Sequence, residues 1–379
     1  MITGLFHNAR QRQNEDNSSI EFPEIIELDD VVKVFKTPSG DFTALKGVSI
    51  SFNQGEFIGV TGKSGSGKST LINMITGIDR PTSGNIRIGN TILNKLTESQ
   101  MAMWRGRNLG IVFQFYQLLP MLSLLENTML PMDFCNVYPP AERETRAMEL
   151  LSRVGLDDVV HKLPAAVSGG QQQAAAIARA MANNPNYLIA DEPTGNLDSK
   201  TAESIFEIFE DLSVQGKTVI MITHDPDLSN RTQRQIILCD GEIIAEPIHR
   251  AFPMLSHRQM LVATHAVQPQ SFPANTEVFR DGDAGNSFQL IIKGEAEITY
   301  NNENRQETLS LKPGQYWGDN LQFLKIFSKL ISVRAGKNGL ETLSLDTDII
   351  KKLATESIPF NKLLATSLMN RHTTSESPE

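Results

Sequence analysis

The sequence predicts an α/β fold with a central parallel sheet, followed by a smaller β-rich domain. A glycine-rich stretch, residues 62–70, stands between an apolar run at 57–60 and a helix-like run at 71–75. Two further apolar runs, 187–190 and 218–222, have the length of buried parallel strands. Toward the C-terminus, short strand-like runs alternate with glycine turns, a pattern typical of a small β-barrel or jelly roll.

Composition is that of an ordinary globular protein with room for two domains. The chain has 379 residues, of which 40% are hydrophobic, and a net charge of -9. The negative charge argues against a nucleic-acid partner. No apolar run approaches a membrane span and the N-terminus lacks a signal-type apolar core, so we expect a cytoplasmic chain. Cys135 and Cys239 have no metal-binding spacing and are interpreted as packing residues.

The first elements lead into the glycine-rich stretch. Residues 1–24 are mostly polar and are predicted to be a flexible leader. Strand-like runs follow at 31–35 and 44–52. Phe35 is either a core aromatic or a platform for an adenine ring, and its position alone does not decide between them.

The glycine-rich stretch fits a phosphate-binding loop. It matches the pattern of Gly, four residues and Gly-Lys-Ser. Its glycines let backbone N–H groups turn inward around phosphate oxygens, and the following helix directs its positive end at the same anion. We expect Lys68 to reach the β- and γ-phosphates and Ser69 to bind Mg²⁺. The residues expected to contact the nucleotide here are Gly62, Lys63, Ser64, Gly65, Ser66, Gly67, Lys68, Ser69 and Thr70.

A helical insertion is predicted next, at about 115–167, after an apolar strand that ends at Gln114. A long alanine-rich helix then begins at Ser168-Gly169-Gly170-Gln171. Ser168 is a good N-cap, and the two glycines leave the helix N-terminus open to an anion. On its own, this pattern is equally compatible with a capped helix that has a loose first turn.

Carboxylates and a histidine follow the two remaining buried strands. Asp191 and Glu192 end the strand at 187–190, where a carboxylate near a phosphate loop holds Mg²⁺ and a second one can orient an attacking water. His224 follows the strand at 218–222. A lone histidine after a strand is usually structural, but strand order predicts that this one lies at the same sheet edge as Asp191 and Lys68.

Together these motifs resemble the ATP-binding cassette (ABC) ATPases over residues 25–247. The resemblance implies a P-loop NTPase fold with a helical subdomain, and a dimer that sandwiches ATP between one phosphate loop and the partner's signature, Ser168 to Gln171. It places Phe35 on the adenine and Asp198 at the dimer contact. It also implies roles for three side chains. Glu192 would be the general base or the water-orienting group, His224 would hold the γ-phosphate and water, and Gln114 would link Mg²⁺ to a membrane partner.

Within that family, the phrases at 80–84, 117–120 and 190–198 look most like the lipoprotein-release, macrolide-export and cell-division branch. This branch implies a separate membrane permease, a second copy of the chain, and a location at the cytoplasmic face of the inner membrane. Ala174 departs from the family, which usually has Arg after the signature glutamines. The alternative within the family is a cassette that transmits force or signal without moving a substrate. An alternative from another class is a soluble cassette that acts on nucleic acid or ribosomes. Such proteins usually carry a second cassette or a coiled-coil insert, and this sequence shows neither.

The remaining residues are interpreted as a linker at 248–271, a barrel at 272–372 and a tail at 373–379. The barrel resembles cyclic-nucleotide-binding domains. Gly318, Asp319 and Lys329 stand where that family grips ribose and phosphate, but the family uses Glu and Arg where this chain has Asp and Lys. The alternative is a degenerate barrel for dimerisation or partner docking. The sequence thus predicts an ATPase that uses ATP and Mg²⁺ to drive a transporter, with a regulatory or dimerisation domain.

Overall fold

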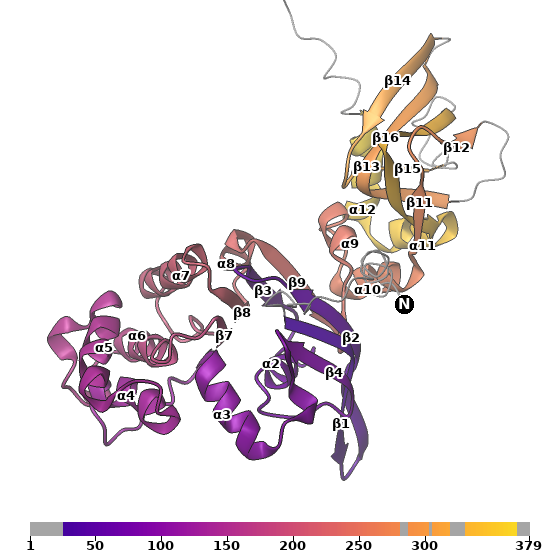
Figure 1. The fold of residues 1–379 in the computed structure, drawn as a ribbon. Helices are drawn as coiled ribbons and strands as arrows, with labels where there is room; N and C mark the ends of the chain where they lie inside the picture. Colours follow the sequence, from indigo (N-terminus) through magenta and orange to yellow (C-terminus); the bar gives the residue numbers. More distant parts are fainter. Residues whose placement is uncertain (1–25, 281–286, 303–304, 319–329, 370–379) are drawn as a thin grey trace, which may run out of the picture. The chain divides into compact units, whose positions relative to one another are not determined.

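The computed structural model of the chain describes residues 26–280, 287–302, 305–318 and 330–369. These residues divide into two compact units between Ile243 and Ile244. The first unit contains the strands and helices around the phosphate loop, and the second is built on an antiparallel sheet (Figure 1).

A six-stranded sheet forms the centre of the first unit, with the order β10-β9-β3-β8-β7-β6. Strands β9, β3, β8, β7 and β6 are parallel, and β10 pairs antiparallel with β9. Because parallel strands end at the same edge of a sheet, the residues that follow β3, β6, β7 and β8 are brought together there. The strands are β3 (Phe57–Thr61), β6 (Leu109–Val112), β7 (Tyr187–Asp191), β8 (Thr218–Ile222), β9 (Arg234–Cys239) and β10 (Glu242–Ile243).

A second, antiparallel sheet in this unit has the order β2-β1-β4-β5. Strands β1 and β2 form a long hairpin in which Phe35 lies opposite Phe42. The strands are β1 (Ile26–Thr37), β2 (Gly40–Phe52), β4 (Ser83–Ile88) and β5 (Thr91–Ile92).

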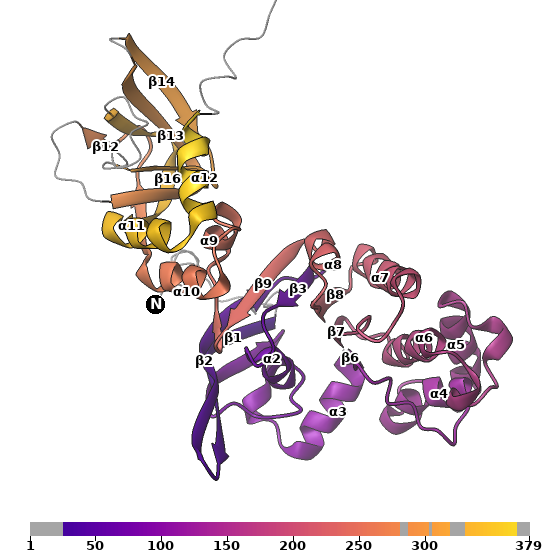
Figure 2. The ribbon, with the colours of Figure 1, turned by 180° about the vertical axis from the view of Figure 1, so that it is seen from behind.

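The helices of the first unit include a group of three, α4, α5 and α6, which pack on one another (Figures 1 and 2). Two of them, α4 and α5, lie in the stretch where the sequence predicts a helical insertion. The helices are α2 (Lys68–Ile75), η1 (Leu93–Lys95), α3 (Glu98–Asn108), α4 (Leu124–Cys135), α5 (Pro140–Arg153), η2 (Asp157–Val159), η3 (Pro164–Ala166), α6 (Gly169–Ala180), α7 (Ser199–Val214) and α8 (Pro226–Arg231).

Both faces of the central sheet are buried. Alternate strand residues such as Leu188 and Val219 pack into one core with α4 to α7, while Ile189 and Ile220 pack into another with α2, β1 and β2. This arrangement explains why β7 and β8 read as continuous apolar runs rather than as alternating ones. Burial on both faces also holds the strand ends, and therefore the site residues, in fixed positions.

The second unit begins with two helices and continues as an antiparallel sheet. Strands β11, β16, β13 and β14 are neighbours in that order, β12 also pairs with β16, and β15 with β13. The elements are α9 (Glu246–Ala251), α10 (His257–Ala266), β11 (Gln268–Phe272), β12 (Glu277–Arg280), β13 (Ser287–Asn302), β14 (Arg305–Leu311), β15 (Tyr316–Gly318), β16 (Leu330–Asp346), α11 (Thr347–Glu356) and α12 (Ile358–Met369).

Aromatic side chains tie the helices of this unit to its sheet. Phe252, which follows α9, packs against Phe288 on β13, Tyr316 on β15 and Phe360 on α12, with ring centroids 5.1–5.8 Å apart. The residues interpreted as a linker, 248–271, contain α10 and parts of α9 and β11. Closure of the sheet into a barrel stays a prediction.

Candidate active site

The phosphate loop connects the buried strand β3 to α2. Gly62 and Gly67 have left-handed φ values of 149° and 105°. A Cβ at Gly62 would lie 2.3 Å from the Leu238 carbonyl oxygen, and one at Gly67 would lie 2.6 Å from the Ala44 carbonyl oxygen. Glycine is therefore required at both positions by backbone conformation and by space. The loop can therefore approach its neighbours closely while its backbone curves in the manner that a bound anion requires.

Lys68 lies inside this loop. Its Nζ donates hydrogen bonds to the Gly62 carbonyl at 2.9 Å and to the Lys63 carbonyl at 3.1 Å. Burial lowers the pKa of the Lys68 ammonium, while the charges of Glu192 and Asp191 act in the opposite direction. The ammonium is thus a buried cation that is held by neutral carbonyls near two carboxylates. Because a charged acceptor binds an ammonium more strongly than a neutral one, phosphate oxygens can replace the carbonyls.

Asp191 is the last residue of β7. Burial, and next the charge of Glu192, raise the pKa of the Asp191 carboxyl, while Lys68 and a hydrogen bond from Ser69 oppose that shift. Two carboxylates in a partly buried site are short of positive charge, and carboxylate and hydroxyl oxygens are the ligands that Mg²⁺ prefers. The pair Asp191 and Ser69 therefore fits the predicted magnesium site. When bound there, Mg²⁺ would neutralise phosphate charge.

Glu192 is the centre of a hydrogen-bonded group. Its φ is 48°, an uncommon conformation for a residue with a side chain, and its N–H donates to the Ile222 carbonyl at 3.1 Å. One carboxylate oxygen lies 2.7 Å from Nε2 of His224, and the other accepts a hydrogen bond of 3.1 Å from Nε2 of Gln114. Three side chains from the ends of β6, β7 and β8 thus meet as strand order predicts.

The signature residues begin α6. Ser168 is the N-cap and forms a capping box with Gln171. A Cβ at Gly169 would lie 2.7 Å from the Tyr116 hydroxyl, and a Cβ at Gly170 would lie 2.4 Å from Cγ2 of Thr201. The two glycines therefore allow the first turn of α6 to approach the loop after Gln114 and the start of α7.

Asp198 caps the helix that Gly170 approaches. Its carboxylate accepts hydrogen bonds from the Thr201 N–H at 3.1 Å and from the Thr201 hydroxyl at 2.6 Å. These bonds lower the pKa of the exposed Asp198 carboxyl. Thr201 thus contacts Asp198 through its hydroxyl and Gly170 through its methyl group.

Phe35 lies on β1 with its ring partly exposed, and Nζ of Lys33 stands 4.9 Å from the ring centroid. An exposed ring face at this position is compatible with the predicted adenine platform. Ala174 is buried in α6, and nothing in the structure explains the absence of Arg there.

The possible ligand site of the second unit is described only in part. Gly318 is the last residue of β15 and pairs with Phe288. Asp319 and Lys329 lie outside the described residues.

Sequence reasoning missed the contacts that Arg179, Tyr116 and Thr201 make around the signature helix. Arg179 donates hydrogen bonds to the carbonyls of Tyr116 and Gln117, at 2.9 and 2.6 Å. A signal was available, because an arginine in the last turn of an alanine-rich buried helix needs acceptors. Its partners are backbone groups distant in sequence, so the signal could not identify them.

Comparison with known proteins agrees with this geometry. Residues 45–195 match the family model described as ABC transporter. An uncharacterized ABC transporter ATP-binding protein of Thermotoga maritima is 44% identical over 220 residues, which are 58% of this chain and 94% of that protein. The macrolide export ATP-binding/permease protein MacB of Syntrophobacter fumaroxidans is 43% identical over 226 residues, 59% of this chain but 32% of that protein.

A solved structure, the dimeric form of a bacterial ABC transporter cassette, shares 42% identity with a TM-score of 0.55 and covers 58% of this chain and 97% of that one. A second dimeric structure, a post-hydrolysis state bound to ADP and Pi, shares 41% identity with the same TM-score and coverage. Neither match concerns the resemblance of residues 272–372 to cyclic-nucleotide-binding domains, which stays a prediction. The chain belongs to the ATP-binding proteins of ABC transporters and is an ATPase.

Proposed function

We propose that the chain hydrolyses ATP as a dimer and thereby drives a separate membrane permease of the export or extraction type. The observation that carries this proposal is the Glu192 carboxylate, held between His224 and Gln114 at the edge of the sheet that also bears the phosphate loop. Each carboxylate oxygen keeps a second acceptor position beside its present hydrogen bond. Glu192 can therefore orient a water molecule and accept its proton while His224 and Gln114 hold the carboxylate in place.

The other site residues position the phosphates. Lys68 exchanges its two carbonyl partners for the β- and γ-phosphate oxygens. Asp191 and Ser69 would hold Mg²⁺, with Gln114 as a further ligand. His224 contacts the γ-phosphate and the attacking water. Phe35 stacks on the adenine.

A second copy of the chain completes the site. In this arrangement the first turn of α6 and Asp198 face the partner's nucleotide. Two solved relatives are dimeric, which supports the dimer. The N-terminal end of α6, with its positive helix dipole, would add an anion-binding group to that nucleotide.

Support for a membrane partner comes from an apolar surface and from a relative's architecture. The loop between β6 and α4 exposes Phe115, Leu119 and Met121, with exposed fractions of 71%, 48% and 85%. Exposed apolar side chains so close in sequence mark a protein contact. MacB is described as an ATP-binding/permease protein, and this chain matches a third of it. Among the described residues, every helix falls short of the length and apolar character needed to cross a membrane.

The catalytic proposal is tested with the purified full chain. Glu192→Gln keeps the acceptor oxygen but loses the basic group, so kcat should fall about 100-fold or more while ATP binding is retained. Lys68→Ala should abolish tight ATP binding because the buried ammonium is lost. Glu98→Gln is the matched control. It changes an exposed carboxylate that pairs with Arg80, and it should leave kcat and ATP binding unchanged. Unchanged turnover in Glu192→Gln would refute its role.

For residues 272–372 we propose a regulatory or dimerisation domain. The long pairing of β13 with β16 and the aromatic packing of α9 and α12 on the sheet provide a rigid body for either role. Calorimetry of the full chain with cAMP and cGMP separates the two. Binding of a cyclic nucleotide that is lost in Lys329→Ala would indicate nucleotide sensing. The absence of binding would leave dimerisation as the role. In that case, removal of residues 248–379 should raise the dimer dissociation constant.

A further inference from the structure

Arg179 connects the signature helix to the loop that follows Gln114. It lies in the last turn of α6, and its two terminal nitrogens donate to the carbonyls of Gln117 and Tyr116 at 2.6 and 2.9 Å. Burial lowers the pKa of its guanidinium, so the surrounding protein bears a desolvation cost for this charge. The planar guanidinium holds its two donors in a fixed geometry, so both adjacent carbonyls are bound by one rigid group.

The same loop contacts the other end of α6 through Tyr116. Its hydroxyl is the group that a Cβ at Gly169 would approach to 2.7 Å. Gly169 and Arg179 are ten residues apart on the helix, a rise of about 15 Å. Tyr116 therefore contacts both ends of α6, through its carbonyl at Arg179 and through its hydroxyl at Gly169.

On its other side the loop is attached to the catalytic group. Gln114 donates to Glu192, and the side chain of Asn196 donates to the Gln114 carbonyl at 3.4 Å. Gln117 has a φ of 50°, which is unfavourable for a residue with a side chain. The hydrogen bond from Arg179 to its carbonyl stabilises that conformation.

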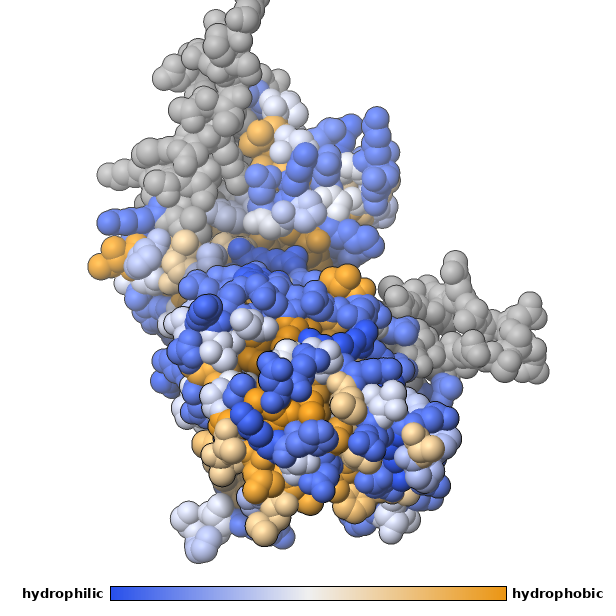
Figure 3. Space-filling view, turned by 90° about the vertical axis from the view of Figure 1, so that its left-hand side faces the viewer, coloured by the Kyte–Doolittle hydropathy of each residue, from blue (hydrophilic) through white to orange (hydrophobic). Residues whose placement is uncertain are grey.

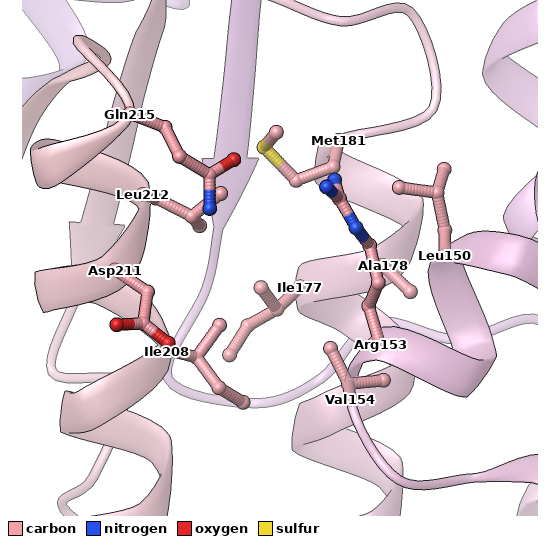
Figure 4. A pocket seen from close by; sticks show the side chains of 10 residues that line it. All are labelled: Leu150, Arg153, Val154, Ile177, Ala178, Met181, Ile208, Asp211, Leu212 and Gln215. Atoms are coloured by element: carbon pink, nitrogen blue, oxygen red, sulfur yellow. The ribbon is translucent and has the colours of Figure 1, made fainter.

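Near its C-terminal end, α6 also borders a pocket that it shares with α5 and α7. A cavity of about 160 Å³ lies among these helices, and Ile177, Ala178 and Met181 of α6 line it (Figure 4). Figure 3 views the side of the molecule that bears α5 and α7, where hydrophobic residues gather among hydrophilic ones.

We propose that Arg179 is a positioning residue for ATP hydrolysis, which makes the loop of Gln114 and the signature turn of α6 move into their active positions as one body. This inference rests on the roles proposed above for Gln114 and the signature. Without Arg179, Gln114 can engage Glu192 while the first turn of α6 is displaced, and the two halves of the site are not aligned together.

The test compares Arg179→Ala with a matched arginine in the same group of helices. Arg146 also donates to a backbone carbonyl, that of Ala182 at 2.7 Å, and its guanidinium lies 4.7 Å from the Tyr138 ring centroid. Among the residues that the structure describes, Arg146 makes no hydrogen bond to residues 114–117, so Arg146→Ala controls for loss of an arginine that contacts backbone.

For the full-length chain we expect Arg179→Ala to lower kcat about 10-fold or more, since misalignment of about 1 Å costs up to 100-fold. The KM for ATP should change less than about twofold because Arg179 does not touch the nucleotide. Arg179→Lys should recover only part of kcat, because an ammonium cannot replace the fork. In hydrogen exchange, peptides covering 114–119 and 168–173 should both exchange faster in Arg179→Ala, and neither should in Arg146→Ala.

Two results would overturn the inference. One is a kcat in Arg179→Ala equal to that of Arg146→Ala, and the other is faster exchange in 114–119 alone, which would indicate a local structural role. Gln114→Ala separates this failure from failure of the proposed function. If Gln114→Ala loses turnover while Arg179→Ala does not, only the positioning role is wrong, whereas full turnover in Gln114→Ala would remove the basis of both.

Discussion

At the scale of single residues, the site places the Asp191 carboxyl where burial opposes its charge. Asp191 and Glu192 are consecutive, and the pKa of Asp191 is raised first by burial and then by its neighbour. Lys68 and Ser69 offset part of this cost. The ionised Asp191, which would bind Mg²⁺, therefore lowers the stability of the nucleotide-free chain. Functional residues commonly have such a cost in stability.

This cost leads to a prediction for Asp191→Asn. A carboxyl with a raised pKa binds its proton more tightly in the folded state, so its contribution to the free energy of unfolding is present below the ordinary pKa of 3.8 and is lost as pH rises through the folded value. At pH 8 the nucleotide-free variant should melt about 2–4 °C above the wild type, as a change of about 1 kcal/mol implies, with a smaller difference at pH 5. Its Mg²⁺-dependent ATPase should be lost.

Thermal melts of both chains at the two pH values check this expectation. Asp41→Asn, which changes an exposed carboxylate, is the control and should show no such pH dependence. A melting temperature below that of the wild type at pH 8 would mean that Lys68 and Ser69 outweigh the cost of burial.

At the scale of elements, the first turn of α6 depends on the absence of a side chain at Gly170. The Thr201 methyl group occupies the space that a Cβ at Gly170 would need, at 2.4 Å. Rotating Thr201 away would break its hydroxyl bond to Asp198. The contact between α6 and α7 and the cap of α7 are thus linked through one threonine.

We therefore expect Gly170→Ala to displace α6 and to lower kcat about 10-fold, with an overpacking cost of about 1–3 kcal/mol. Adding Thr201→Ser removes the methyl group and keeps the hydroxyl, so the double variant should recover most of the lost activity. Steady-state ATPase assays of the two single variants and the double variant measure the coupling. Equal losses in Gly170→Ala and in the double variant would show that the contact with Thr201 is not the cause.

At the scale of the whole molecule, the apolar loop residues are assigned to the membrane partner. If so, Phe115→Ser combined with Met121→Ser should move the chain from the membrane fraction to the soluble fraction of its native host while leaving basal ATPase intact. The control is Val214→Ser, which removes another exposed apolar side chain, 88% exposed, at the end of α7. Equal fractionation of the loop variant and the wild type would contradict this use of the loop.

Much of the site could be predicted from sequence because its motifs are local. The phosphate loop, Asp191 with Glu192, and the start of α6 each need particular residue types at fixed spacing, so their chemistry is visible without coordinates. The convergence of Gln114, Glu192 and His224 could be predicted as well, since each follows a strand of one parallel sheet.

The sequence by itself determined the family, the nucleotide chemistry and the strand ends that bear it, because these depend on local pattern and on the geometry of parallel sheets. Only the tertiary structure decided that Arg179 holds the carbonyls of Tyr116 and Gln117, that Thr201 fills the space at Gly170, and that α9 and α10 occupy much of the expected linker. Those contacts join residues that are distant in the chain. They are made either by a hydrogen bond to a backbone carbonyl or by a side chain that fills the space beside a glycine. The sequence can show that a buried arginine or a pair of glycines needs a neighbour, but it does not show which residue that neighbour is.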